Sequence, residues 1–138
     1  MTLVIQSSLT VSEKKPEPYI VSADSDLMEL FKTNNNVIPG YTGTNLGFYG
    51  PQGRTLRLEV QDSDFIDQLV SFKFQDKRIT NLEMETSAIY ALAKVLGHRA
   101  LSMNAIIANR STGNFSKDPK GLIEALIQFT LEKLLLLK

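Results

Sequence analysis

Strand-like segments alternate with helix-like segments along this chain, and that alternation constrains its fold more than any other feature. Apolar and β-branched residues predict strands at 1–10, 19–21, 55–60 and 99–108. Helical spacing predicts helices that begin near Ser25, near Asp62 or Ser63, near Glu85 and at Asp118. Chains with this alternation fold as helices layered on a sheet. We therefore expect one α/β domain over residues 1–138, a layered α/β/α structure with a central mixed sheet.

The same periodicities predict which faces are buried. The helix 85–96 is expected to end at Gly97, which readily takes the left-handed conformation, and to bury the apolar stripe Ala88, Ile89, Leu92, Ala93 and Leu96. The strand 99–108 is apolar on both sides, which predicts a central place in the sheet. The segment 78–82 is expected to be a brief extended link. The last helix is expected to face inward with Leu122, Ile123, Leu126, Ile127, Thr130 and Leu134.

Composition excludes several classes of function. Lysine plus arginine equals aspartate plus glutamate at 15 each in 138 residues, so no net field draws the chain to nucleic acid or to an acidic membrane, and neither is expected as a partner. Cysteine is absent, which removes disulfides, thiol catalysis and thiolate metal sites. The apolar runs 3–5 and 134–137 are too short for a signal sequence or a membrane span, so we expect a cytoplasmic protein. No His, Asp or Glu grouping has metal-ligand spacing, so no metal is expected.

A first cluster of candidate functional residues lies in the long Gly- and Pro-rich loop that ends near residue 54. Gln52 and Arg54 are two residues apart, so in extended chain their side chains point the same way. An amide and a guanidinium together can contact the edge of a planar heterocycle, and Phe48 offers a face for stacking. A surface turn with a solvated Arg54 explains the same residues.

A second cluster, Glu83, Met84 and Glu85, lies where an extended segment enters a helix. Carboxylates at this position favour the helix dipole, so capping alone accounts for them. The functional interpretation is that they accept hydrogen bonds from vicinal sugar hydroxyls, with Met84 adding an apolar contact.

A third cluster lies where the predicted strand 99–108 runs into a polar loop. Ile106 and Ile107 could wall a pocket there, and Arg110 could lie over it. A plain strand end with an exposed arginine is the alternative.

These clusters, in this order, resemble the carboxy-terminal half of uridine phosphorylases of the type I nucleoside phosphorylase family. Four segments look like motifs of that family nearly letter for letter: 37–42, 47–54, 79–85 and 106–110. The resemblance runs from about Pro18 to Lys138, and it implies a nucleoside phosphorylase-like domain that is partial.

The resemblance implies a pentosyltransferase of pyrimidine salvage and nucleoside catabolism. Phosphate, the co-substrate, would attack the anomeric carbon of uridine reversibly and give uracil and ribose 1-phosphate without any cofactor. Gln52 and Arg54 would be the catalytic residues, holding the uracil edge and stabilising its charge as the bond breaks. The base pocket would also include Phe48, Ile106, Ile107 and Arg110, and the ribose would be held by Glu83, Met84 and Glu85. A homo-oligomer is also implied.

The resemblance is incomplete at the phosphate site. The glycine-rich loop and the arginines that grip phosphate in this family belong to an amino-terminal half without a counterpart in these 138 residues. A non-catalytic nucleoside-binding or assembly fragment is therefore one alternative. A purine nucleoside phosphorylase or nucleosidase is another, but it requires an acid near the end of 106–110, where Ala108, Asn109 and Arg110 supply none.

Overall fold

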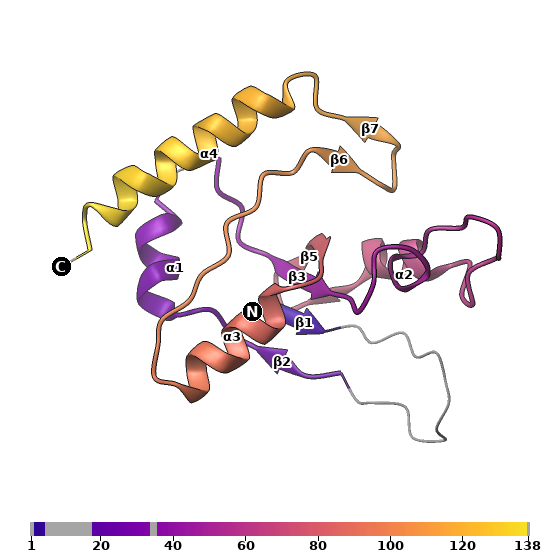
Figure 1. Cartoon of the computed structure of the whole chain (residues 1–138), viewed down its shortest axis with the longest axis horizontal. Helices are drawn as coiled ribbons and strands as arrows, with labels where there is room; N and C mark the ends of the chain where they lie inside the picture. Colours follow the sequence, from indigo (N-terminus) through magenta and orange to yellow (C-terminus); the bar gives the residue numbers. More distant parts are fainter. Residues whose placement is uncertain (1, 5–17, 34–35, 138) are drawn as a thin grey trace.

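The computed structural model describes residues 2–4, 18–33 and 36–137, which form a mixed sheet accompanied by helices (Figure 1). The strands of the sheet have the order β2-β1-β3-β5-β4. Their bounds are β1 Thr2–Val4, β2 Ile20–Val21, β3 Tyr41–Thr44, β4 Lys73–Phe74 and β5 Lys77–Glu83. Neighbours β1, β3 and β5 are parallel, whereas β2 and β4 pair antiparallel at the two edges. This arrangement confirms the predicted α/β class; most of the predicted strand 1–10 lies outside the described residues.

The helices are α1 Ser25–Phe31, the short 3₁₀ helix η1 Gly50–Gln52, α2 Phe65–Ser71, α3 Thr86–Val95 and α4 Pro119–Leu134. A separate hairpin joins β6 Ala108–Asn109 to β7 Asn114–Phe115. Helix α3 packs on β1, β2 and β3, α2 packs beside β5, and α1 packs on α4 (Figure 1). No helix in the described part of the chain combines the length and hydropathy that a membrane crossing requires.

Local capping explains where the helices begin and end. The side chain of Asp118 accepts a hydrogen bond from Gly121 N at 2.9 Å, as predicted for the start of α4. Helix α3 ends before Gly97, whose φ of 73° is left-handed, also as predicted. The predicted cap Ser25 of α1 is wrong by one residue, because the Asp24 carboxylate accepts from Leu27 N at 3.0 Å. The cap position of α2 is likewise Asp64, one residue beyond the predicted Ser63 and two beyond the alternative Asp62.

Two predicted strands are wrong. Residues 55–60 form an irregular loop with bends at 56–58 and mostly exposed side chains. The place beside β3 is taken by β5, which was predicted from the sequence as only a brief link. Residues 100–107 are extended, but they pair with no strand among the described residues. Alternation of side chains is necessary for a strand, but a strand also needs a neighbour with free backbone groups.

The buried face of α3 is also the reverse of the predicted one. Its buried residues are Thr86, Ser87 and Tyr90, whereas Ile89 and Leu92 are 56% and 61% exposed. The buried polar groups are paired: Ser87 N donates to Thr44 Oγ1 at 3.1 Å, and Ser102 N donates to the Tyr90 hydroxyl at 2.7 Å. Hydrogen bonding therefore allows the polar side of α3 to face the sheet.

The packing between α1 and α4 is apolar but incomplete. Phe31 is buried and meets Phe129 edge to face, with ring centroids 5.9 Å apart. No residue of α4 is fully buried, and several of its predicted inward residues stay about half exposed: Leu122, Ile123, Ile127 and Leu134. The apolar face of α4 is therefore covered only in part by the described chain.

Candidate functional site

The site forms at the carboxyl ends of the neighbouring parallel strands β3 and β5. Thr44 lies opposite Glu83 in their register, and Asn45 N donates to Glu83 O at 2.9 Å. The chain therefore leaves both strands at the same edge of the sheet, where open α/β sheets place ligands. The loop after β3 carries the first cluster, and the residues after β5 carry the second.

A tight turn presents the first cluster. Gln52 N and Arg54 N both donate to Tyr49 O at 3.0 Å, and Gly53 has a left-handed φ of 68°. A Cβ at Gly53 would also lie 3.2 Å from the Ile66 side chain, so both backbone conformation and space favour glycine. This turn, and not an extended chain, brings the Gln52 and Arg54 side chains together.

The guanidinium of Arg54 joins three groups of this turn. Its Cζ lies 3.7 Å from the centroid of the Phe48 ring, a cation–π geometry. It donates to Gln52 Oε1 at 2.6 Å and to the Phe48 carbonyl. Gln52 is 4% exposed and Phe48 is 49% exposed, so an aromatic face opens to solvent beside a buried amide.

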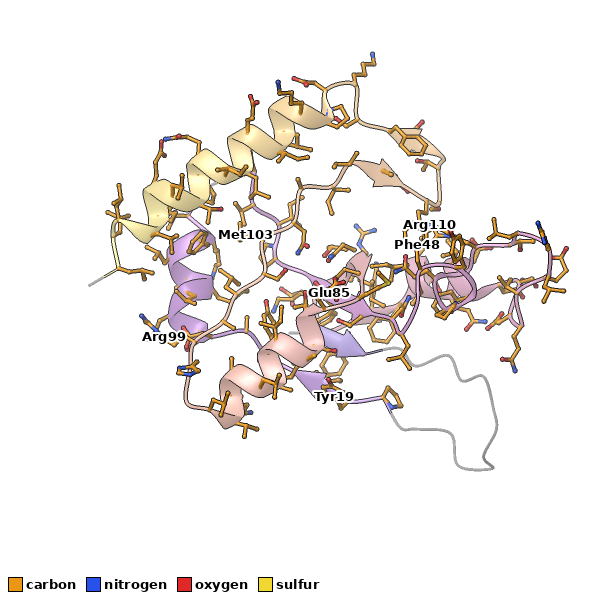
Figure 2. All side chains as sticks on the ribbon, viewed as in Figure 1. Tyr19, Phe48, Glu85, Arg99, Met103 and Arg110 are labelled. Carbon is orange, nitrogen blue, oxygen red and sulfur yellow. The ribbon has the colours of Figure 1, made fainter. Side chains whose placement is uncertain are left out.

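Arg110 joins the same group from the third cluster. Its guanidinium donates to the Gln52 carbonyl across 58 positions of sequence, and Figure 2 shows Arg110 and Phe48 close together. Asn109 Oδ1 accepts from Ser111 N at 3.0 Å and from Thr112 N, which shapes the turn after β6. Burial lowers the pKa of Arg110, and the positive charge of Arg54 lowers it further. Both guanidiniums donate to Gln52, that of Arg54 to the side-chain oxygen and that of Arg110 to the backbone carbonyl.

The second cluster is engaged mainly with the start of α3. The Glu83 carboxylate accepts from Glu85 N at 2.8 Å and from Thr86 N at 2.6 Å, and it also accepts from the hydroxyls of Thr44 and Thr86. Glu85 is exposed, and its carboxylate accepts from Met84 N at 3.1 Å. Glu83 thus organises the helix start, and Glu85 and the 42% exposed Met84 extend beyond it.

The structure brings together Phe48, Gln52, Arg54 and Arg110. Among the described residues, no hydrogen bond links this group to the second cluster, and Figure 2 shows Glu85 apart from Phe48 and Arg110. Ile106 is 51% exposed and precedes β6. A large groove of about 920 Å³ lies elsewhere, between α1, α4 and residues 98–103, and includes none of the residues named as candidates.

Two polar residues at the end of β3 escaped the sequence analysis. Thr44 is buried and connects Glu83 to the backbone of α3. Asn45 is 1% exposed, and neither its side-chain oxygen nor its nitrogen has a hydrogen-bond partner among the described residues. In the sequence they appear only as a Thr-Asn pair at the end of a short strand. Such pairs are common, so the role of this one becomes visible only once β3 is seen to pair with β5.

The chemistry of the group suits a planar polar ligand. Two guanidiniums supply donors, the buried amide supplies a donor and an acceptor, and the phenyl ring supplies a stacking face. Neither Arg54 nor Arg110 forms an ion pair with a carboxylate of the described residues. The pair therefore favours a ligand that carries carbonyl oxygens or develops negative charge.

The fold identifies the class of protein to which the chain is similar. The structure matches a nucleoside phosphorylase from Trypanosoma brucei, described as showing uridine phosphorylase activity, with a TM-score of 0.77, 24% identity, and coverage of 87% of this chain and 44% of the other. It matches a uridine phosphorylase of the oomycete Phytophthora capsici with a TM-score of 0.67, 16% identity, and coverage of 91% and 52%. The described chain therefore has a nucleoside phosphorylase fold in part.

Sequence comparison then points to one kind of phosphorylase. The chain is 38% identical to the uridine phosphorylase of Thermococcus kodakarensis over 78 residues, which are 56% of this chain and 27% of that protein. No family model matches. The recognised resemblance to uridine phosphorylases is confirmed, and the chain spans between about a quarter and a half of the length of the relatives it matches.

Proposed function

We propose that this chain contributes the base and ribose contacts of a uridine phosphorylase, a pentosyltransferase that converts uridine and phosphate reversibly to uracil and ribose 1-phosphate. One observation carries the proposal: Gln52, Arg54 and Arg110 meet beside the Phe48 ring at the carboxyl edge of the sheet. They do so in a chain whose sequence relative is a uridine phosphorylase.

The recognition of uracil follows from donor and acceptor chemistry. The base edge presents carbonyl oxygens and a ring N–H, which match guanidinium donors and the two-sided amide of Gln52. Negative charge develops on the base as the glycosidic bond breaks. A guanidinium near that charge interacts more strongly with the transition state than with uridine, which is the requirement for catalysis.

The ribose contact falls to the second cluster. Because four donors already approach the Glu83 carboxylate, Glu85 is the carboxylate with capacity for ribose hydroxyls. Met84 and the isoleucines 106 and 107 would supply apolar contacts. The phosphate site would come from the part of the relatives that this chain does not span. Homo-oligomerisation and a cytoplasmic location stay predictions.

The test requires a complete subunit. We would replace the matching segment of the Thermococcus kodakarensis uridine phosphorylase with this chain and measure uracil release from uridine and phosphate. Gln52→Ala is expected to lower kcat/KM by about 5- to 140-fold, since leaving buried polar partners unpaired costs about 1–3 kcal/mol and each 1.4 kcal/mol is about tenfold.

The matched control is Gln61→Ala, which removes an exposed amide from the bend before α2. It is expected to leave kcat/KM unchanged. Equal losses of kcat/KM in the two variants would refute the recognition role of Gln52. Saturable uridine binding by a complete hybrid that shows no uracil release would favour the non-catalytic alternative.

A further inference from the structure

Residues 100–107 are an extended segment whose backbone is largely unpaired. At its ends, Ala100 O accepts from Asp24 N at 3.0 Å and Ile107 O accepts from Ser116 N at 2.7 Å. Ser102 N donates to the Tyr90 hydroxyl. Between Met103 and Ile106, no backbone group is hydrogen-bonded to the rest of the described chain. A row of free N–H and C=O groups is a template for another strand.

From residue 103 to residue 107 the exposure of the side chains alternates as in a strand. Met103, Ala105 and Ile107 are partly buried, whereas Asn104 and Ile106 are exposed. The sequence pattern predicts a central strand, but no strand of the described residues pairs with the segment. It therefore lacks only a partner strand.

The partly buried side of the segment borders an apolar groove. This groove of about 920 Å³ is lined by Leu27 and Phe31 of α1, by Leu101 and Met103, and by the apolar side of α4. The α4 residues Ile127, Leu131 and Leu134 are about half exposed there. Figure 2 shows Met103 on the strand-like segment between the sheet and these helices. The unpaired backbone groups of residues 103–106 therefore lie next to an apolar surface.

We propose that residues 101–107 and the adjoining groove bind the part of the phosphorylase fold that this chain does not span. That part of the fold adds a β-strand along Met103 to Ile106. The solved relatives favour this occupant, because the present chain covers 44% and 52% of them and the remaining chain belongs to the same fold. The apolar lining and the zero formal net charge favour an apolar strand over a charged partner. The inference depends on the fold and not on the proposed uridine chemistry.

The experiment supplies, as a second polypeptide, the part of the fold that this chain does not span. The part of the Trypanosoma brucei phosphorylase that this chain does not cover would be co-expressed with it, and the mixture examined by light scattering and amide hydrogen exchange. We expect a one-to-one complex in which the amides of residues 103–106 exchange at least tenfold more slowly. Absence of a complex, or a complex without this protection, would overturn the proposal.

A backbone variant distinguishes strand pairing from non-specific hydrophobic association. Ala105→Pro removes an N–H that is free in the chain alone, so the fold should survive while affinity for the added polypeptide falls at least tenfold. The control Glu59→Pro changes an exposed loop residue and should bind normally. Equal affinity in both variants would contradict strand addition. Protection of residues 103–106 in dimers of the chain alone would instead identify a second copy as the occupant and overturn the assignment.

Discussion

A single carboxylate organises the junction between β5 and α3. Glu83 accepts two backbone N–H groups at the start of α3 and two hydroxyls, one of them from Thr44 on the neighbouring strand. Hydrogen bonds to a charged acceptor are stronger than neutral ones. At the scale of residues, Glu83 therefore stabilises the edge at which the candidate site forms.

Replacing Glu83 by Gln should destabilise the fold. The substitution removes the charge and turns one acceptor into a donor that faces other donors, which we expect to cost about 1–3 kcal/mol of the free energy of unfolding. Urea denaturation measures the change. Glu85→Gln, which disturbs one bond to Met84 N, should cost much less. Similar losses would mean that Glu83 does not hold the helix start.

Tyr90 should make the fold sensitive to alkali. Burial raises the pKa of Tyr90 above its usual 10.0, the hydrogen bond from Ser102 N lowers it, and Glu83 raises it. A raised pKa means that the fold favours the protonated phenol. Its stabilising contribution is full below pH 10.0 and is lost as pH rises through the raised pKa.

Absorbance at alkaline pH can isolate this group, because the chain has four tyrosines and no tryptophan. Tyr90→Phe should abolish the tyrosinate step that occurs at the highest pH. Tyr49→Phe, at a position 56% exposed, should keep that step. A highest step that survives in Tyr90→Phe would contradict the assignment.

At the scale of elements, the helices were predictable and the pairing of strands was not. Helices α1, α3 and α4 can be predicted from the helical spacing of their apolar residues and from nearby capping residues such as Asp118 and Gly97. Strand β5 was predicted only as a short link because its neighbour β3 lies about 40 positions earlier in the sequence, and no local pattern indicates that the two pair. The face of α3 was reversed because the partners of Thr86 and Tyr90 lie on other elements.

The site was predictable to a similar extent. Residue types and spacing indicated Gln52, Arg54 and Arg110, but their meeting depends on a 3₁₀ turn and on a contact across 58 positions. The role of Glu83 at the helix start depends in the same way on Thr44 from another strand. Chemistry could be proposed from sequence, whereas geometry required the fold.

The start of α1 provides a direct test of capping. Asp24→Ala should lower the free energy of unfolding by about 1 kcal/mol, since it leaves Leu27 N without its acceptor. Ser25→Ala, at the cap predicted from sequence, should change it little. Thermal denaturation of both variants measures the difference. A larger loss in Ser25→Ala would restore the sequence-based assignment.

At the scale of the molecule, the described chain has a small core and wide apolar surfaces. Its buried apolar residues are few: Val21, Leu27, Phe31, Tyr41 and Tyr90. Apolar side chains of α3 and α4 remain exposed, far beyond the scattered exposure usual for a monomer. The fold is therefore coherent locally and incomplete as a unit.

The 138-residue chain alone should release no measurable uracil from uridine and phosphate. Aligning a nucleophile with its substrate can lower a barrier by about 7–11 kcal/mol, and no residue of the proposed site is assigned to hold phosphate. Chromatographic detection of uracil, with the Thermococcus kodakarensis enzyme as control, measures the outcome. Release at a rate near that of the control would place a complete catalytic apparatus within these residues.

Arg54 covers one face of the Phe48 ring and also occupies the oxygen of Gln52. The protein thus holds an internal competitor at the place proposed for the base. A base that stacks on that face would have to displace the guanidinium first, and its apparent affinity would be reduced to the fraction of time that the face is open. A ring open one-tenth of the time would weaken binding about tenfold, without any change in the contacts of the bound state.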